Sequence, residues 1–194
     1  MQDEPRQLSV FERMQRNVNV VALLLTSVAV TVEVFMRRRM GERSIGMRGF
    51  IGFVMLFVFG VFFPGENLVP LFLFMWAFAA MCTVQRASAL LRRRRGISGH
   101  SRYDGEPRVA ALAPKWDELR LKRTGEPIVL TVIGLITLEC NRPLGMWLII
   151  AAGATAISVR LMEQAERQRV TDLGDAMIEQ EVRSERLRAM RERR

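Results

Sequence analysis

Residues 45–63 have the sequence IGMRGFIGFVMLFVFGVFF, and residues 68–84, just beyond them, have the sequence LVPLFLFMWAFAAMCTV. Each segment is apolar on every side of a helix, whereas a helix at the surface of a soluble protein keeps a polar face at helical spacing. Each also approaches the roughly 20 apolar residues that a helix needs to cross a bilayer core about 30 Å thick. The two segments therefore predict a pair of transmembrane helices joined by a turn at Pro64–Asn67.

Three further apolar segments flank this pair, at Val18–Met36, Ile128–Leu138 and Leu144–Val159. Together the five segments predict an all-α integral membrane protein with a bundle of about five transmembrane helices. The first segment contains several polar residues and follows arginines, so it also fits an interfacial helix, which leaves four spans. The fourth segment rises only about 17 Å as a helix, which fits either a tilted span or a hairpin that re-enters the membrane.

The basic residues are concentrated in three places, and this distribution predicts the orientation. Of 29 lysines and arginines, 25 follow the first segment, separate the third from the fourth, or follow the fifth. Positive residues of short loops stay on the cytoplasmic side of a membrane, so these regions and the C-terminus are expected there. Lysine accounts for only two of the 29, which suggests a GC-rich genome and hence a bacterial inner membrane.

Composition divides the chain into five parts. They are an N-terminal tail, three membrane helices, a cytoplasmic basic loop with an interfacial helix, a membrane helical hairpin and a charged helical tail, at residues 1–17, 18–84, 85–126, 127–159 and 160–194. In the loop, Val109, Leu112, Trp116 and Leu119 recur at helical spacing and predict an amphipathic helix interrupted by a proline. In the tail, Gly174 predicts a break between two helices.

The arginine clusters are candidate contacts for anionic lipid headgroups or for a partner protein, with Trp116 at headgroup depth. The candidates are Arg37, Arg38, Arg39, Arg92, Arg93, Arg94, Arg95 and Trp116. Acidic and basic residues near a membrane interior are candidates for a functional polar site, and here these are Glu33, Glu139 and Arg142. We expect Glu33 to pair with Arg37 one turn later, and Glu139 to pair with Arg142.

No catalytic, cofactor-binding or metal-binding site is expected. His100 is the single histidine, which excludes multi-histidine metal sites and bis-histidine haem ligation. Cys82 and Cys140 are expected near opposite faces of the membrane, so they form neither a metal motif nor a disulfide. Nucleic-acid binding is disfavoured, because the basic regions hold almost no aromatic residues for stacking.

These observations favour a non-enzymatic inner-membrane subunit that anchors a multiprotein assembly, of the secretion, conjugation or envelope type, through its loop and tail. Its partners would be anionic lipids, other membrane or cytoplasmic proteins and, in one variant of the hypothesis, further copies of itself. The alternative is a small homo-oligomeric channel or transporter in which Glu33 lines the path. A third class is a membrane-embedded enzyme that uses His100 or Asp104.

Overall fold

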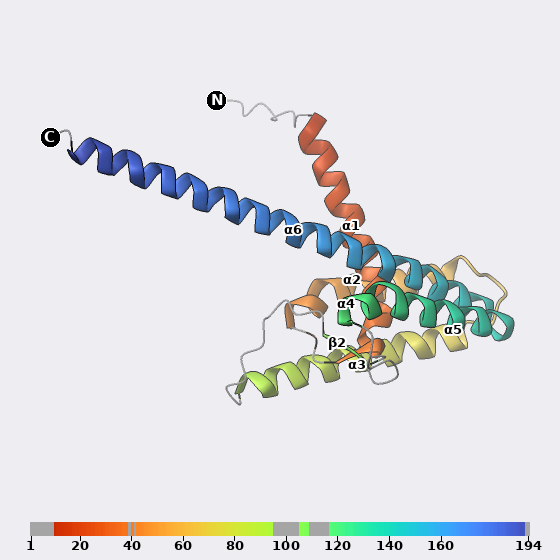
Figure 1. Ribbon diagram of the computed structural model, residues 1–194. Coiled ribbons are helices and arrows are strands. Elements are labelled where there is room, and N and C mark those ends of the chain that lie inside the picture. The colour runs from red at the N-terminus through yellow and green to blue at the C-terminus, as the bar shows by residue number, and fades with distance from the viewer. Residues whose placement is uncertain (1–9, 39, 41, 95–104, 109–116, 193–194) are drawn as a thin grey trace, which may run out of the picture. The chain divides into compact units, whose positions relative to one another are not determined.

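The computed structural model describes residues 10–38, 40, 42–94, 105–108 and 117–192, and most of them are helical. The long helices are α1 (Val10–Met36), α2 (Glu42–Val61), α3 (Val69–Arg94), α5 (Glu126–Cys140) and α6 (Arg142–Glu192), as Figure 1 shows. The predicted all-α class is confirmed. The chain divides into two compact units, Met1–Ser158 and Val159–Arg194, which are described separately below.

Among the residues that the structure describes, three helices are long and apolar enough to cross a membrane by length and composition. These stretches are Asn17–Met36, Val69–Arg92 and Arg142–Glu181. The apolar part of α2, Ile45–Val61, is shorter, and α5 has 15 residues. The helices indicate a membrane protein, whereas the expected bundle of five spans is not confirmed.

Helix α1 occupies the centre of the first unit. Every residue from Thr26 to Val34 is buried, so this part of α1 is enclosed on all sides by the other helices. The core around it includes Leu56 of α2, Phe78 of α3 and Trp147 of α6. Gly52 of α2 allows α1 to pack closely against α2, because a Cβ atom at this position would lie 2.6 Å from the backbone oxygen of Ser27.

The predicted turn at Pro64–Asn67 is present, and it lies beside the turn between α5 and α6. At the start of α3 the Oδ1 atom of Asn67 accepts a hydrogen bond from the backbone N–H of Val69, at 3.1 Å. Asn141 caps α6 in a similar way by accepting from Leu144 N–H, also at 3.1 Å. Its Nδ2 atom donates to the carbonyl of Asn67 at 2.8 Å. The α2–α3 and α5–α6 turns therefore share one end of the unit, as the charge distribution predicted.

Part of the basic loop is held against the end of α1 by a short ladder that the sequence did not indicate. Strand β1 (Arg37–Arg38) pairs antiparallel with strand β2 (Glu106–Pro107), with Arg37 opposite Pro107. Gly105 precedes β2 with a φ of 87°, and a Cβ atom there would lie 2.6 Å from the carbonyl oxygen of Arg38. Only glycine fits such a close approach with this backbone conformation.

Helix α5 ends at Cys140, directly before Asn141 and Pro143. At its start the chain is already helical, because α4 (Glu118–Arg120) and a π-helical turn, η2 (Leu121–Gly125), lead directly into Glu126 and Pro127. The N–H of Glu126 donates to the carbonyl of Leu121, five residues back. The wider π turn makes room for the Pro127 ring, which clashes with a regular preceding turn. The amphipathic helix predicted around Trp116 lies mostly outside the described residues.

The second unit, Val159–Arg194, is formed by the C-terminal part of α6. The tail is helical, as predicted, and it continues α6 without interruption, so the predicted break at Gly174 is wrong. Ion pairs one turn apart support the helix on both sides of this glycine, at Glu163–Arg167 (2.6 Å) and Glu179–Arg183 (3.3 Å).

Candidate functional site

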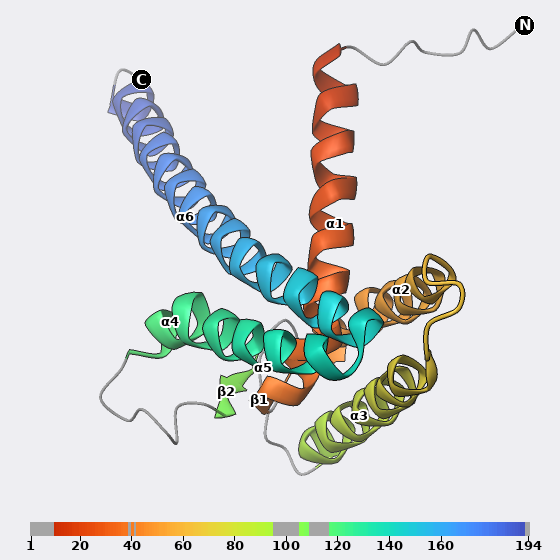
Figure 2. The ribbon, with the colours of Figure 1, turned by 90° about the vertical axis from the view of Figure 1, so that its right-hand side faces the viewer.

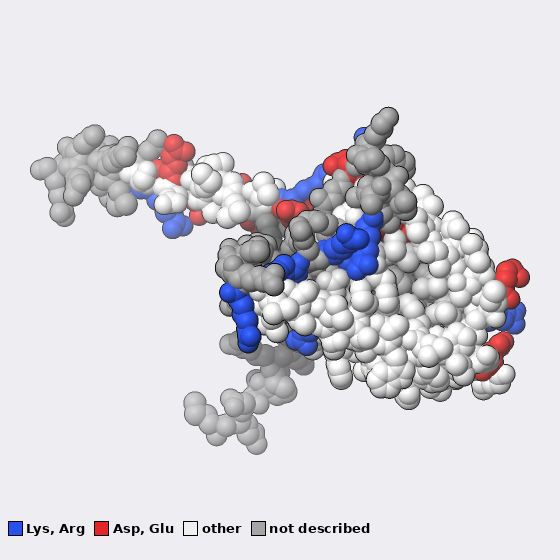
Figure 3. Space-filling view, turned by 90° about the horizontal axis from the view of Figure 1, so that it is seen from below, with Lys and Arg blue, Asp and Glu red and all other residues white. Residues whose placement is uncertain are grey.

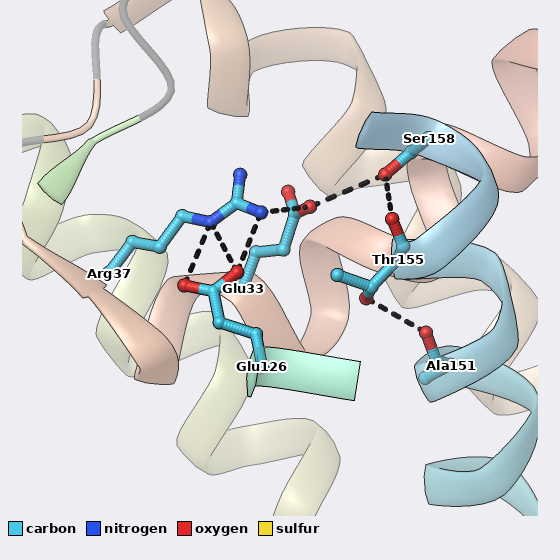
Figure 4. Close-up of polar contacts among 6 residues, drawn as sticks. All are labelled: Glu33, Arg37, Glu126, Ala151, Thr155 and Ser158. Atoms are coloured by element: carbon cyan, nitrogen blue, oxygen red, sulfur yellow. Dashed lines mark hydrogen bonds and ion pairs between the residues drawn. The ribbon is translucent and has the colours of Figure 1, made fainter. Parts of the chain in front are cut away.

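A buried ion-pair cluster lies where α1 ends. The Nε atom of Arg37 donates to the two carboxylate oxygens of Glu126 at 3.3 and 3.0 Å, and its Nη2 atom donates to Glu126 Oε2 at 2.8 Å. Nη2 also pairs with Glu33 Oε1 at 3.1 Å. Figure 4 shows the guanidinium between the two carboxylates. The side chains of Arg37 and Glu126 are 1% and 0% exposed, so this arrangement, called here the Arg37 cluster (Glu33, Arg37 and Glu126), is excluded from solvent.

Helices α3 and α6 also reach this cluster. The hydroxyl of Ser158 in α6 donates to the carbonyl of Thr155 at 2.9 Å and also lies 3.5 Å from Glu33 Oε1, so the two acceptors share its single hydrogen (Figure 4). From α3, the Nε2 atom of Gln85 donates to the carbonyl of Arg37 at 3.0 Å. Four helices of the first unit therefore meet through polar contacts at one place.

The Arg37 cluster connects helices inside the first unit through buried ion pairs. Carboxylates that accept two charge-assisted hydrogen bonds from one guanidinium are held in a fixed geometry. Among the described residues, every buried side-chain nitrogen and oxygen has a hydrogen-bond partner. The described residues also hold no group of three His, Cys, Asp or Glu side chains that would suit a metal ion. The cluster therefore joins α1 and α5 through buried ion pairs.

The predicted pair of Glu33 and Arg37 is confirmed, but its surroundings differ from the expectation. Arg37 was expected to contact lipid headgroups or a partner, and it is buried instead, because Glu126 folds onto it from a position 89 residues away in the chain. In the alternative function, a channel or transporter, Glu33 lines the path. In the structure its carboxylate pairs with Arg37 and lies 3.5 Å from the hydroxyl of Ser158.

The remaining predicted surface arginines are found at the ends of helices and strands. Arg38 in β1 and Arg94 at the end of α3 are exposed, and Arg92 is half-buried. Arg39, Arg95 and Trp116 lie outside the described residues, as does the side chain of Arg93.

Glu139 and Arg142 flank the α5–α6 turn and are both exposed. The expected pair between them is not formed: among the residues that the structure describes, ion pairs at a turn spacing occur at Glu33–Arg37 and in the tail, and none joins these two. His100 and Asp104, the residues of the enzyme hypothesis, lie outside the described residues. Cys82 and Cys140 are free thiols.

Large apolar side chains are exposed on three helices of the first unit. They include Phe50, Phe57 and Val61 of α2, Leu73 and Trp76 of α3, and Val132, Leu135 and Ile136 of α5. Figure 3 shows a broad face of the first unit without charged side chains, with acidic and basic residues at its edges. Apolar patches of this extent are rare on soluble monomers and are typical of surfaces that lipid or a partner covers.

A second, separate apolar surface lies on the tail helix. Val170, Leu173, Met177 and Ile178 are each more than 60% exposed, although most of the residues around them are charged or polar. The first three follow one another at spacings of three and four residues, so they lie along one face of α6. We call them the tail stripe (Val170, Leu173 and Met177).

Comparison with known proteins adds no family assignment: neither a protein-family model, nor a curated protein sequence, nor a solved structure matches this chain.

Proposed function

We propose that this chain is a non-enzymatic, multi-pass subunit of a bacterial inner membrane that anchors a larger protein assembly. In this proposal the first unit resides in the membrane, and the basic loop and the C-terminal helix face the cytoplasm, where they contact lipid headgroups and other proteins. The observation that carries the proposal is the exposed tail stripe on an otherwise polar helix.

The tail stripe is better explained by a docked partner than by solvent. Val170, Leu173 and Met177 are 65%, 66% and 71% exposed. A helix that serves only as a soluble extension gains nothing from large apolar side chains in water. Burial of one such side chain stabilises a contact by about 1.5–3 kcal/mol, so three on one face supply several kcal/mol for a partner helix.

The basic end of the first unit supports the orientation. Exposed basic side chains described there are Arg38, Arg86, Arg94, Arg108, Arg120 and Arg123. They come from regions that the sequence places on the cytoplasmic side, and each adds about 1 kcal/mol of attraction to an anionic leaflet. Headgroup binding of this kind would fix the depth of the unit and leave the tail available for protein contacts.

Site-specific photo-crosslinking in living cells tests the proposal. A photoreactive amino acid replaces Met177 in the tail stripe, and Asp175, which is exposed on the other side of the same helical turn, serves as the matched control. Discrete higher-mass adducts from position 177 but not from position 175 are expected. No adduct at position 177, or equal adducts at both positions, would overturn the assignment of the tail as a docking element.

A paired variant separates docking from folding. Leu173→Asp combined with Met177→Asp changes only exposed positions, so the chain should reach the membrane in normal amounts while partner proteins no longer copurify. The matched variant Asp175→Asn should leave copurification unchanged. Retention of the same partners by the double variant would contradict the proposal.

A further inference from the structure

The first unit has two distinct ends, and contacts at these ends show in which direction its helices run. One end holds the side-by-side turns of Asn67 and Asn141. The other holds the Arg37 cluster, which Gln85 of α3 and Ser158 of α6 approach. At 1.5 Å per residue, these two residues lie about 24 Å along their helices from the turn end. Helices α3 and α6 therefore both run from the turn end toward the cluster end.

Helix α1 does not share this direction. On α3, Phe74 packs against Phe35 with ring centroids 5.4 Å apart, and Gln85 bonds the carbonyl of Arg37. These two α3 residues are about 16 Å apart along their helix, whereas their partners at the end of α1 are only about 3 Å apart. Contacts that are spread along one helix and concentrated on the other indicate a steep crossing.

The contacts with α6 repeat the pattern. Trp147 Nε1 donates to Thr31 Oγ1 at 3.1 Å, and Ser158 reaches Glu33. Trp147 and Ser158 are about 16 Å apart along α6, whereas their partners are only about 3 Å apart along α1. Figures 1 and 2 show the same relation from two sides, with α1 running across α2, α3 and α5 rather than alongside them.

The two halves of α1 have different surroundings. The half from Thr26 to Val34 is enclosed, and it passes α2 at Gly52, near the middle of that helix. The preceding turns are open: Val18, Val20, Val21 and Leu24 are between 41% and 58% exposed. Helix α1 therefore enters the bundle from the side, between its two ends, and its N-terminal half carries exposed apolar side chains.

We infer that α1 is not a fifth span: its C-terminal half threads between four spanning helices, and its N-terminal half lies along the membrane and binds lipid. Lipid is the occupant of the exposed face because Val18, Val20, Val21 and Leu24 are exposed there and belong to a stretch, Asn17–Met36, that is apolar enough to reside in a membrane. The resulting topology places the start of α1, with Arg13 and Arg16, on the cytoplasmic side, where the positive-inside rule expects basic residues.

Thiol labelling in intact cells tests the number of spans. In a Cys82→Ser, Cys140→Ser background, Asn17→Cys reports on α1 and Glu66→Cys reports on the α2–α3 turn, since both native residues are exposed. A membrane-impermeant reagent should label position 66 in intact cells and position 17 only after permeabilisation. Any result that places the two positions on opposite sides supports four spans. Labelling of both positions from the same side would overturn the inference, and it would do so without bearing on the tail stripe.

Lipid contact needs a separate readout. A fluorophore on Val21→Cys, in the same background and in reconstituted vesicles, should be quenched by lipids that carry a quencher on the acyl chain. The same fluorophore on Met177→Cys in the tail should keep its emission. If position 21 is quenched no more than position 177, the N-terminal half of α1 projects into water and the inferred lipid contact is wrong.

Discussion

Removing the carboxylate of Glu126 should strongly destabilise the first unit. In the folded protein Arg37 donates to Glu126 at 2.8, 3.0 and 3.3 Å, and neither side chain is more than 1% exposed. Loss of one partner from such a buried pair typically costs 3–5 kcal/mol, because the remaining charge stays out of water. Since Arg37 keeps its contact with Glu33, we expect Glu126→Ala to lie near the lower limit, at about 3 kcal/mol.

The measurement is equilibrium unfolding of the purified protein in mixed detergent micelles, followed by the loss of helical circular dichroism. A change of about 3 kcal/mol corresponds to roughly a hundredfold shift in the unfolding equilibrium constant. The matched control is Arg167→Ala, which removes an ion pair of the tail whose arginine is 78% exposed, and no measurable change is expected. A free energy of unfolding for Glu126→Ala within about 0.5 kcal/mol of the unaltered protein would refute the reasoning.

A combined variant separates loss of charge from loss of packing. Arg37→Met alone leaves the carboxylates of Glu33 and Glu126 facing each other without the guanidinium between them. Adding Glu33→Gln and Glu126→Gln removes both charges while keeping the size of each side chain. The triple variant should therefore be more stable than Arg37→Met, and the opposite order would show that packing, not charge, determines the cost.

Three further substitutions should each lower the melting temperature in detergent. Gly52→Ala places a methyl group 2.6 Å from the α1 backbone and should cost about 1–3 kcal/mol, whereas Gly46→Ala, with nothing within 4 Å, should cost little. Asn141→Ala removes the cap of α6 and the bond to Asn67, for about 1–2 kcal/mol. Gly105→Ala forces a side chain into a φ of 87° and should cost about 1–2 kcal/mol. Unchanged melting for any of these variants would contradict the packing described at that position.

The helices and turns were predictable from the sequence because they depend on local patterns. Long apolar segments mark α1, α2, α3 and the first part of α6, and the proline- and asparagine-containing turns mark their ends. The tail helix was predictable as a continuation of α6, since helix-forming residues dominate it. The break expected at Gly174 does not occur because a single glycine costs only about 1 kcal/mol in a helix that neighbouring ion pairs support.

The candidate site was only half predictable. The pair of Glu33 and Arg37 follows from their spacing of one helical turn, but nothing local connects either residue with Glu126, 89 residues away. One signal was present: an acidic residue directly before a proline at the edge of an apolar segment. The polar residues of α1 also fit an interfacial helix, but in the structure Thr26, Thr31 and Glu33 lie in the part of α1 that other helices enclose. Thr31 bonds Trp147 and Glu33 bonds Arg37, and such partners are set by tertiary packing.

The β1–β2 ladder and the π turn were not predictable for a different reason. Strands of two residues have no alternation to detect, and their pairing follows from where α1 and the loop happen to meet. The π turn changes the helical register by one residue without changing composition. Both features are local adjustments that bring Arg37 and Glu126 into contact.

The separation of Arg37 from Glu126 in the chain has a consequence for how the protein is made. Ribosomes add about 5–20 residues per second, so the 89 residues between the two side chains correspond to roughly 4–18 s during which the arginine has emerged and its carboxylate partner has not. Ser158, which contacts Glu33, is synthesised later still. During that interval Glu33 is the one carboxylate of the Arg37 cluster that has been made, so the cluster is completed only when α5 has been synthesised.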